Sequence, residues 1–540
     1  MDTKMKSIQN LYHQVSNREY LENTYGREIW VQVSGHRELN KADAGFWAAL
    51  IPLDQVDDVF RDVGWDSSVG TQAPCFVSDG LGSSYQRLQP DFNPCENIVH
   101  YRDFYGIKPD YVELVEEFRL LNNLYHDSLS DTYYAILDNG ECIEVAKIEN
   151  QTRAFIKLQF LMKYASARQM ALILFFDIRT NIPGSLSHNG LSEFSEQYKK
   201  GNLFYEIWGS EHEIGDPSVY SVLMGKKVIF PKPVEECGYW PYEKDREYND
   251  FIIGIDEYGE PRTFTSDPDR LSNYFGANPG APHYLTPVFF KKEVLQRYLS
   301  HPDRYSVEDG YLRCQSLWGM AIDNHHKDYV SAYLGDLGRD LPEQEQNHWL
   351  QYNVATSEKL SSVAFQRDFL CISAESNMSD LKFKAGFKNF QKKWRQSFSW
   401  DLFLPLADSD EYNIKLLRIP ITESQEEFDH QVLSLVKTII DSLNEKEIVK
   451  QLKNSDDLKG GISKLERWLS EQGISQFEPH IKFLRNLQEL RSTGTGHRKG
   501  KGYEKIKQEF GLSSSNFAEV FDNILFNANA FLSFLSENFL

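Results

Sequence analysis

"NFAEVFDNILFNANAFLSFLSENF", residues 516–539, carries a strong helical pattern. Its apolar residues recur every three or four positions, which places them on one face of a helix. A stripe this wide needs partner helices to cover it, so the stretch predicts a helical bundle in this part of the chain. The face consists of Phe517, Val520, Phe521, Ile524, Leu525, Ala528, Phe531, Leu532 and Leu535.

Three further amphipathic segments precede this helix. The first, residues 424–448, opens on a capping pattern in which Ser424 is followed three positions later by Glu427. Shorter helices are predicted over residues 462–473 and 476–491. Four amphipathic helices over residues 421–540 therefore predict an all-α C-terminal bundle. The first of them has the apolar stripe Phe428, Val432, Leu435, Val436, Ile439 and Leu443.

The residues before 421 differ from the bundle because they contain predicted strands as well as helices. We therefore expect an α+β protein in which a large mixed α/β N-terminal region is followed by the bundle. Over residues 1–230, β-rich stretches alternate with helical ones, which predicts a domain of mixed α+β type. Residues 231–420 are rich in Pro, Gly and Tyr and read as a loop-rich α+β middle domain. Predicted strands include 27–35, 132–148, 170–179 and 412–421, and a helix is predicted over 110–127.

Composition limits the classes of function. The 540-residue chain has a formal net charge of −21, which argues against a surface that coats nucleic acid nonspecifically, so any contact with nucleic acid must be local. Its six cysteines form no C-x-x-C pair, as in a protein with reduced thiols. The apolar run at 170–176 is too short to cross a bilayer, and the first residues do not resemble a signal peptide. We expect a cytoplasmic protein with no membrane partner, metal or cofactor.

The connection between the last two long helices reads "LQELRSTGTGHRKGKGY", residues 487–503. If the helix continued from Arg491 to His497, the two side chains would differ by roughly 240° in direction and about 9 Å in height. The two glycines between them make an unbroken helix unfavourable, and a helix ending near Thr493 could bring His497 back beside Arg491. The spacing therefore predicts a turn.

Basic residues concentrate at this connection. Six Lys or Arg side chains stand against one acid, Glu504, between residues 491 and 507. Such a local excess is what docking of phosphate groups requires in an acidic chain. The six are Arg491, Arg498, Lys499, Lys501, Lys505 and Lys507.

A bundle of about four helices with Arg-x(4–6)-His between its last two long helices resembles the HEPN domains, and Arg491 and His497 fit this spacing. The resemblance covers residues 421–540 alone. It implies a homodimer in which two motifs face each other and form a metal-independent endoribonuclease site. Ser492 stands where catalytic members often carry Asn, Asp or His, which leaves catalysis open. Many members are toxins or effectors of anti-phage defence, so the resemblance also implies abortive infection by growth arrest. A phage-derived or nucleic-acid trigger would then bind residues 1–420.

The chemistry of RNA cleavage suits these residue types. His497 titrates near neutrality and could act as general acid or base, while Arg491 offers a planar fork to phosphate oxygens. Ser492 could complete this catalytic set with a hydrogen bond. The side chains expected to bind the RNA backbone are Arg498, Lys499, Lys501 and Lys505.

Structural roles compete with these interpretations. Arg491 could pair with Glu489 or Glu466, and His497 could cap the helix, which would leave a non-catalytic HEPN-like module for RNA binding or dimerisation in a sensor or scaffold. Basic and aromatic residues alternate over 382–395, but the spacing of the aromatic residues favours a core stripe over RNA stacking. The pair His325 and His326 lacks the spacing of a metal site.

Overall fold

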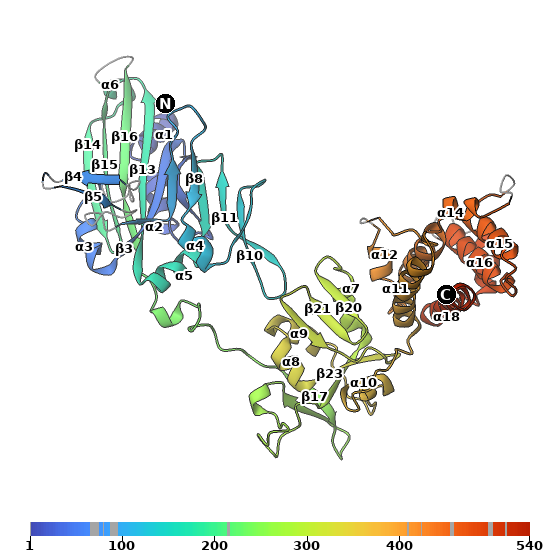
Figure 1. Cartoon of the computed structure of the whole chain (residues 1–540). Coiled ribbons are helices and arrows are strands. Elements are labelled where there is room, and N and C mark those ends of the chain that lie inside the picture. Colours follow the sequence, from blue (N-terminus) through green and yellow to red (C-terminus); the bar gives the residue numbers. More distant parts are fainter. Residues whose placement is uncertain are drawn as a thin grey trace. The chain divides into compact units, whose positions relative to one another are not determined.

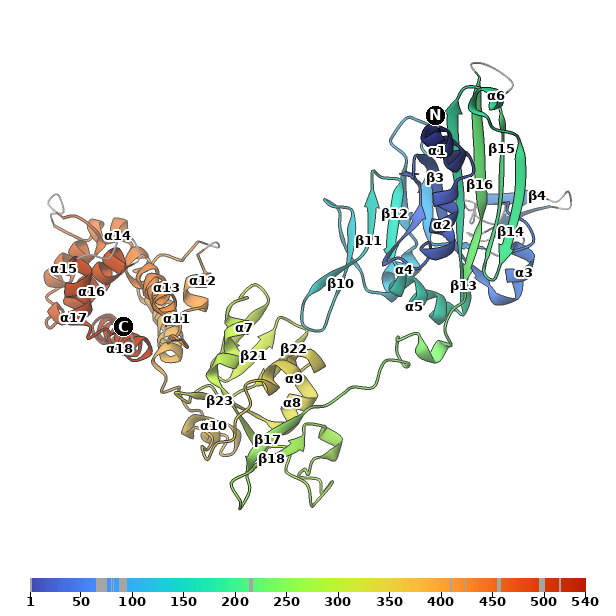
Figure 2. The same ribbon diagram turned by 180° about the vertical axis from the view of Figure 1, so that it is seen from behind.

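The computed structural model describes residues 2–64, 75–78, 80, 82–86, 95–212, 217–407, 410–422, 424–453, 458–494, 501–513 and 516–540. The chain divides into two compact units (Figures 1 and 2). The first unit comprises Met1–Leu137 and Glu141–Asp245, and the second comprises Asp138–Gly140 and Arg246–Leu540. The protein is α+β, with its large sheets in the first unit and helices predominating toward the C-terminus. In the described part of the chain, every helix is too short or too polar to cross a bilayer.

The first unit is built mainly from strands. Its elements are α1 (Asp2–Tyr12), α2 (Val15–Asn23), β1 (Trp30–Ser34), β2 (His36–Leu39), β3 (Ala42–Pro52), η1 (Leu53–Gln55), α3 (Val56–Val59), β4 (Cys75–Ser78), β5 (Ser83–Gln86), β6 (Glu96–Asn97), β7 (Val99–Arg102), β8 (Tyr111–Leu114), α4 (Glu116–Leu121), β9 (Tyr125–Asp127), β10 (Thr132–Ile136), β11 (Cys142–Glu149), β12 (Arg153–Lys157), α5 (Leu158–Arg168), β13 (Met170–Pro183), α6 (Leu186–Asn189), β14 (Phe194–Lys200), β15 (Leu203–Glu211), β16 (Ser218–Ile229) and η2 (Val234–Glu236).

Two antiparallel sheets organise this unit. One has the order β1-β12-β11-β10-β9, and the larger has the order β14-β15-β16-β13-β3-β2, with β6 paired to β3. Strand β13 is central and buried on both faces, as predicted from its continuous apolar run. Leu172, Leu174 and Phe176 face the core shared with the smaller sheet, α2 and α5. Ala171, Ile173 and Phe175 alternate with them and face α3 on the other side. Figure 2 shows α1 and α2 lying across the long strands.

Strand β16 carries two consecutive buried lysines. Lys226 Nζ donates to the carbonyl oxygen of Val59, at 2.7 Å, on one side of the large sheet. Lys227 Nζ donates to the carbonyl oxygens of Leu21 and Tyr25 on the other side. Backbone carbonyls near the ends of α3 and α2 thus hydrogen-bond both ammonium groups, and burial lowers the pKa of Lys227.

The predicted single helix over residues 110–127 is wrong. The stretch instead forms β8, the short helix α4 and β9. Val112 and Leu114 are buried and Tyr111 is exposed, which is the alternation of a strand, and β8 pairs with β7. The apolar residues of this stretch fit a helical spacing, but the alternation of buried and exposed residues over Tyr111–Leu114 is that of a strand.

The second unit begins with short antiparallel sheets around one core, which contains Phe290, Tyr298, Leu334 and Trp349. Its elements up to residue 368 are β17 (Asp250–Ile255), β18 (Pro261–Thr265), η3 (Pro268–Arg270), β19 (Pro287–Lys291), η4 (Lys292–Leu295), α7 (Gln296–Leu299), β20 (Tyr305–Glu308), β21 (Tyr311–Cys314), β22 (Trp318–Ala321), β23 (Tyr329–Tyr333), α8 (Leu334–Asp340), α9 (Glu343–Leu350) and α10 (Ser362–Asp368).

Helix α8 packs very closely because two of its residues are glycines. A Cβ on Gly335 would lie 2.2 Å from the ring of Tyr284, and a Cβ on Gly338 would lie 1.8 Å from the carbonyl oxygen of Ser266. In α9, the fully buried Gln346 accepts a hydrogen bond from the Ser266 hydroxyl. The stretch "GDLGRDLPEQEQNHW", residues 335–349, therefore belongs to the core of this unit.

The bundle contains more helices than the four amphipathic segments recognised in the sequence. Its elements are α11 (Ser379–Ser397), α12 (Tyr412–Lys415), α13 (Gln425–Val436), the π-helical turn η5 (Lys437–Asp441), α14 (Glu445–Lys450), α15 (Gly461–Glu471), α16 (Glu478–Gly494), α17 (Lys501–Glu509) and α18 (Phe517–Phe539). The predicted apolar faces of residues 424–448 and 516–539 are buried in one core. Ser424 caps α13 by accepting a hydrogen bond from the Glu427 N–H, as predicted.

Helix α11 packs into this same core. Its aromatic residues Phe383, Phe387, Phe390 and Trp394 are buried, which confirms the core interpretation of that stripe. The helix contacts α18 directly (Figure 1). The bundle core therefore begins at α11, inside the range 231–420 that the sequence indicated as a middle domain.

Residues 412–421 form no strand, contrary to prediction. They begin with α12 and continue as an irregular segment whose N–H groups are bound by distant side chains. Gln431 accepts from the N–H of Arg418, at 2.9 Å, and Asp380 accepts from that of Ile419, at 3.2 Å. These side chains take the place of a neighbouring strand as hydrogen-bond acceptors.

Candidate functional site

Arg491 lies in the last turn of α16, at the end of the helix that leads into the glycine-rich connection. Its guanidinium pairs with the carboxylate of Asp441, at 3.3 Å, and the two side chains are 34% and 39% exposed. The arginine is thus open to solvent and could contact a bound phosphate. Of the two partners expected from sequence, Glu466 instead pairs with Arg485, at 2.5 Å.

Asp441 is brought to Arg491 by an irregularity in the preceding helix. Helix α13 does not continue as an α-helix but widens into η5, and Asp441 is the last residue of that π-helical turn. The hydroxyl of Thr438 donates to the carbonyl oxygen of Ser434, and Ser442 donates to that of Thr438. Such π-turns are rare and occur frequently at functional sites.

Ser492 makes a local hydrogen bond. Its hydroxyl donates to the carbonyl oxygen of Glu489, at 3.1 Å, and Thr493 donates to the same oxygen, at 2.7 Å. The single proton of Ser492 is therefore committed to the helix backbone, while its oxygen lone pairs can still accept. Helix α16 is described as far as Gly494, so the predicted helix end near Thr493 stays a prediction.

Several predicted site residues lie outside the described part of the chain. These are His497, Arg498 and Lys499, together with the side chain of Lys501, the first residue of α17. Lys505 is exposed on α17. The proximity of Arg491 to His497 therefore stays a prediction, although both ends of the connection, Gly494 and Lys501, are defined.

A polar group beside the connection was not recognised in the sequence. The hydroxyl of Tyr503 on α17 donates to the side-chain oxygen of Gln425, at 3.1 Å, and Gln425 donates to Asp429, at 2.7 Å. A Cβ on Gly494 would lie 3.6 Å from that Asp429 carboxylate. A carboxylate thus lies directly beside the end of α16. Tyr503 and Gln425 are 78 positions apart, so no local motif could indicate the pairing.

His325 forms a separate buried cluster in the second unit. Its ring nitrogens contact Asp309, at 2.5 Å, and Asp323, at 3.1 Å, while its side chain is 2% exposed. Burial lowers the pKa of His325, but the hydrogen bonds to both carboxylates outweigh burial and raise it. Arg367 also binds Asp309 with two nitrogens. Within the described ranges, His, Cys, Asp and Glu form no group of three that could hold a metal ion.

Comparisons with protein-family models, with curated proteins and with solved structures give no match to this chain.

Proposed function

We propose that residues 421–540 form a HEPN-like, metal-independent endoribonuclease that acts as a homodimer in anti-phage defence by growth arrest, with the preceding residues as a sensing and regulatory region. One observation carries the proposal. Arg491 lies at the solvent-exposed end of α16, where the connection containing His497 begins. The single helical core, formed in part by α13, α15, α16 and α18, also supports it.

The proposed reaction divides its steps between these residues. A general base removes the proton from the 2′-hydroxyl, whose oxygen attacks phosphorus, and a general acid gives a proton to the departing 5′-oxygen. We assign His497 to one of these transfers, which is worth about 10²–10⁴-fold in rate. Arg491 would stabilise the negative charge on the phosphoryl oxygens. Ser492 would accept a hydrogen bond from the substrate or the connection, because its proton is already donated to Glu489.

The basic residues of the connection and of α17 would hold the RNA backbone. Lys505 is exposed on α17. Lys501 lies one turn earlier on the same helix, so the two residues share one helix face. Arg498 and Lys499 complete the proposed set. A duplicated motif in a homodimer would double this positive surface, which favours RNA over a small substrate.

The alternative is a non-catalytic HEPN-like module that binds RNA or dimerises. The ion pair with Asp441 favours this alternative, because a neighbouring carboxylate neutralises part of the charge that a phosphate would need. An arginine that only joins α16 to the turn η5 would have the same geometry.

RNA cleavage separates the two functions. Purified full-length protein is incubated with labelled single-stranded RNA in the presence of EDTA, and products are resolved on a denaturing gel. We expect cleavage by the wild type, its loss in Arg491→Ala and His497→Ala, and its retention in Arg485→Ala. Arg485 is a suitable control because it lies on the same helix and also pairs with an acid. RNA binding without cleavage would establish the non-catalytic module.

Growth of cells tests the defence role directly. Cells expressing the wild type should stop growing after phage challenge, whereas cells expressing His497→Ala should lyse. Equal behaviour of both, with and without phage, would contradict growth arrest. Sedimentation velocity of the same proteins reports the expected dimer.

A further inference from the structure

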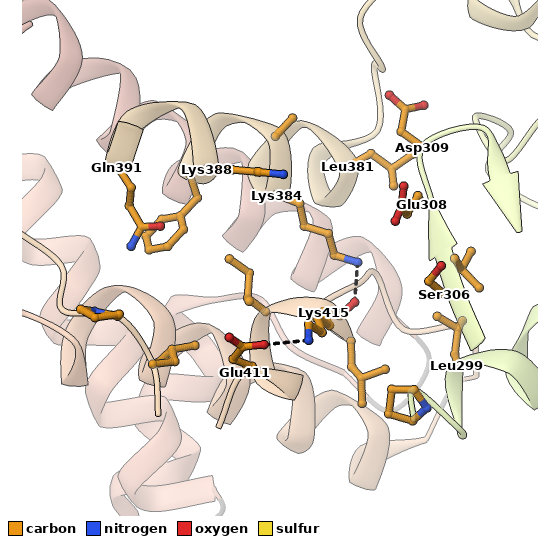
Figure 3. A pocket seen from close by; sticks show the side chains of 18 of the residues that line it. Leu299, Ser306, Glu308, Asp309, Leu381, Lys384, Lys388, Gln391, Glu411 and Lys415 are labelled. Carbon is orange, nitrogen blue, oxygen red and sulfur yellow. Dashed lines mark hydrogen bonds and ion pairs between the residues drawn. The ribbon is translucent and has the colours of Figure 1, made fainter. Parts of the chain in front are cut away.

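The second unit contains a cleft of about 820 Å³ that the sequence did not indicate. Three segments enclose it: residues 298–309, which end in β20 and the turn after it, residues 381–395 of α11, and residues 404–406 with 411–416, which include α12. Figure 3 shows these walls around an open space. The volume falls within the usual range of about 300–1,000 Å³ for sites that bind small molecules.

Much of the lining is apolar. Leu299, Leu381 and Phe387 contribute to two of the walls, and Leu404 with Ile414 contributes to the third. Leu404 is 45% exposed, so it offers apolar surface to a ligand in the cleft. An apolar or aromatic group placed in the cleft would remove this surface from water, at about 25 cal/mol per Å².

Two lysines of α11 supply positive charge to the same space. Lys384 and Lys388 are four positions apart, so they lie on one face of the helix, and both side chains extend along the cleft (Figure 3). Lys384 Nζ donates to the carbonyl oxygen of Lys415, at 2.9 Å, which leaves two of its protons for another acceptor. Among the described residues, none forms a hydrogen bond or ion pair with the side chain of Lys388.

The other charged groups of the cleft are mostly neutralised. Arg395 pairs with Asp401, and Lys415 pairs with Glu411, at 2.6 and 2.7 Å. On the opposite wall Asp309 is bound by His325 and Arg367. The two α11 lysines therefore remain as the groups able to receive an anion, while Glu308 lies on the wall across from them (Figure 3).

We propose that this cleft binds a small organic anion, in which a phosphate or carboxylate contacts Lys384 and Lys388 and an apolar or aromatic body fills the space beyond them. The opposite face of α11 is buried in the bundle core, so a bound ligand would also stabilise the helix that joins cleft and bundle. The proposal is independent of RNA cleavage.

Isothermal titration calorimetry of the full-length protein, with 1-naphthyl phosphate as the probe, tests whether the cleft binds a small organic anion. The parts of the probe are tested separately with inorganic phosphate and 1-naphthol, and 1-naphthoate distinguishes carboxylate from phosphate. We expect 1-naphthyl phosphate or 1-naphthoate to bind, and each of the two separate parts to bind at least tenfold more weakly.

Substitutions place the binding in the cleft. Lys384→Met and Lys388→Met should each raise the Kd of the better probe about tenfold, the loss of one charge-assisted hydrogen bond. Lys392→Met is the matched control, because Lys392 is exposed on the same helix outside the cleft. Lys388→Glu, a charge reversal at an exposed position, should abolish binding.

Three outcomes would overturn the proposal: no binding of either naphthyl anion, equal Kd values for the Lys392 and cleft variants, or inorganic phosphate binding as tightly as the naphthyl anions. Arg491→Ala should bind the probe like the wild type, so that failure here and failure of the nuclease proposal are distinguishable.

Discussion

Neutralising Asp441 tests whether Arg491 contacts RNA. The substitution Asp441→Asn removes a carboxylate 3.3 Å from the guanidinium while keeping a side chain of similar size. In the free protein the loss is small, because exposed ion pairs are worth about 0.2–1 kcal/mol. We therefore expect the variant to fold, with a melting temperature lower by a few degrees at most.

Although Asp441→Asn is expected to lower the stability slightly, it is expected to raise the affinity for RNA. A phosphate bound to Arg491 would approach Asp441 to about 6 Å, where repulsion between unit charges is roughly 0.7 kcal/mol in water and about 3 kcal/mol at an effective dielectric constant of 20. Both side chains are about one-third exposed, which favours the lower part of this range. Removing the carboxylate should therefore lower the Kd for RNA about fivefold, a change of about 1 kcal/mol.

Fluorescence anisotropy with a labelled single-stranded RNA at 50 and 200 mM salt measures this change, and the gain should be smaller at the higher salt. Glu466→Gln is the matched control. It alters the net charge equally, Glu466 is 35% exposed, and its partner Arg485 lies about 9 Å farther back along the same helix. Equal gains in the two variants would show a general charge effect, and weaker binding by Asp441→Asn would refute a role for Arg491 in RNA contact.

Two further predictions concern the stability of the second unit. The raised pKa of His325 means that its contribution to stability is fully present below about pH 6.5 and is lost as the pH rises through the folded-state value, so the urea-midpoint advantage of the wild type over His325→Asn should shrink from pH 6 to pH 9. The exposed His301→Asn should show no such trend, and an advantage of the wild type that grows with pH would contradict the assignment. Gly338→Ala should destabilise by about 1–3 kcal/mol in urea unfolding, because its Cβ would overlap the Ser266 carbonyl oxygen. Gly386→Ala on α11 has its nearest neighbouring atom at 4.0 Å and should stabilise by up to about 1 kcal/mol, so equal effects of the two substitutions would refute the packing argument.

Much of the fold could be predicted from periodicity because the relevant contacts repeat along one element. The stripe from Phe517 to Leu535 and the aromatic stripe of α11 are buried as expected. Residues 412–421 could not be predicted in this way. Gln431, Asp380 and Glu427 accept hydrogen bonds from the N–H groups of Arg418, Ile419 and Ile421, and the acceptor for Ile419 lies 39 positions away.

The candidate sites show the same limit. The sequence indicates Arg491 through a local spacing, but its partner Asp441 is 50 positions away and depends on a π-turn that no residue pattern marks. The cleft was missed for a similar reason, since three separate segments build it. The spacing over 382–395 indicates a core stripe of aromatic residues, whereas a binding role for Lys384 and Lys388 depends on the segments that fold opposite to them.

The buried lysines of β16 have a consequence for strand pairing in the first unit. Neighbouring residues of a strand point to opposite faces, and Lys226 and Lys227 each find carbonyl acceptors on their own face. A slip of one position would exchange the faces and leave both ammonium groups without these acceptors. It would also move Gly225, where a Cβ would meet the Phe204 carbonyl oxygen at 2.2 Å, out of its tight place. These three residues therefore favour a single register of the central strands over one shifted by one position.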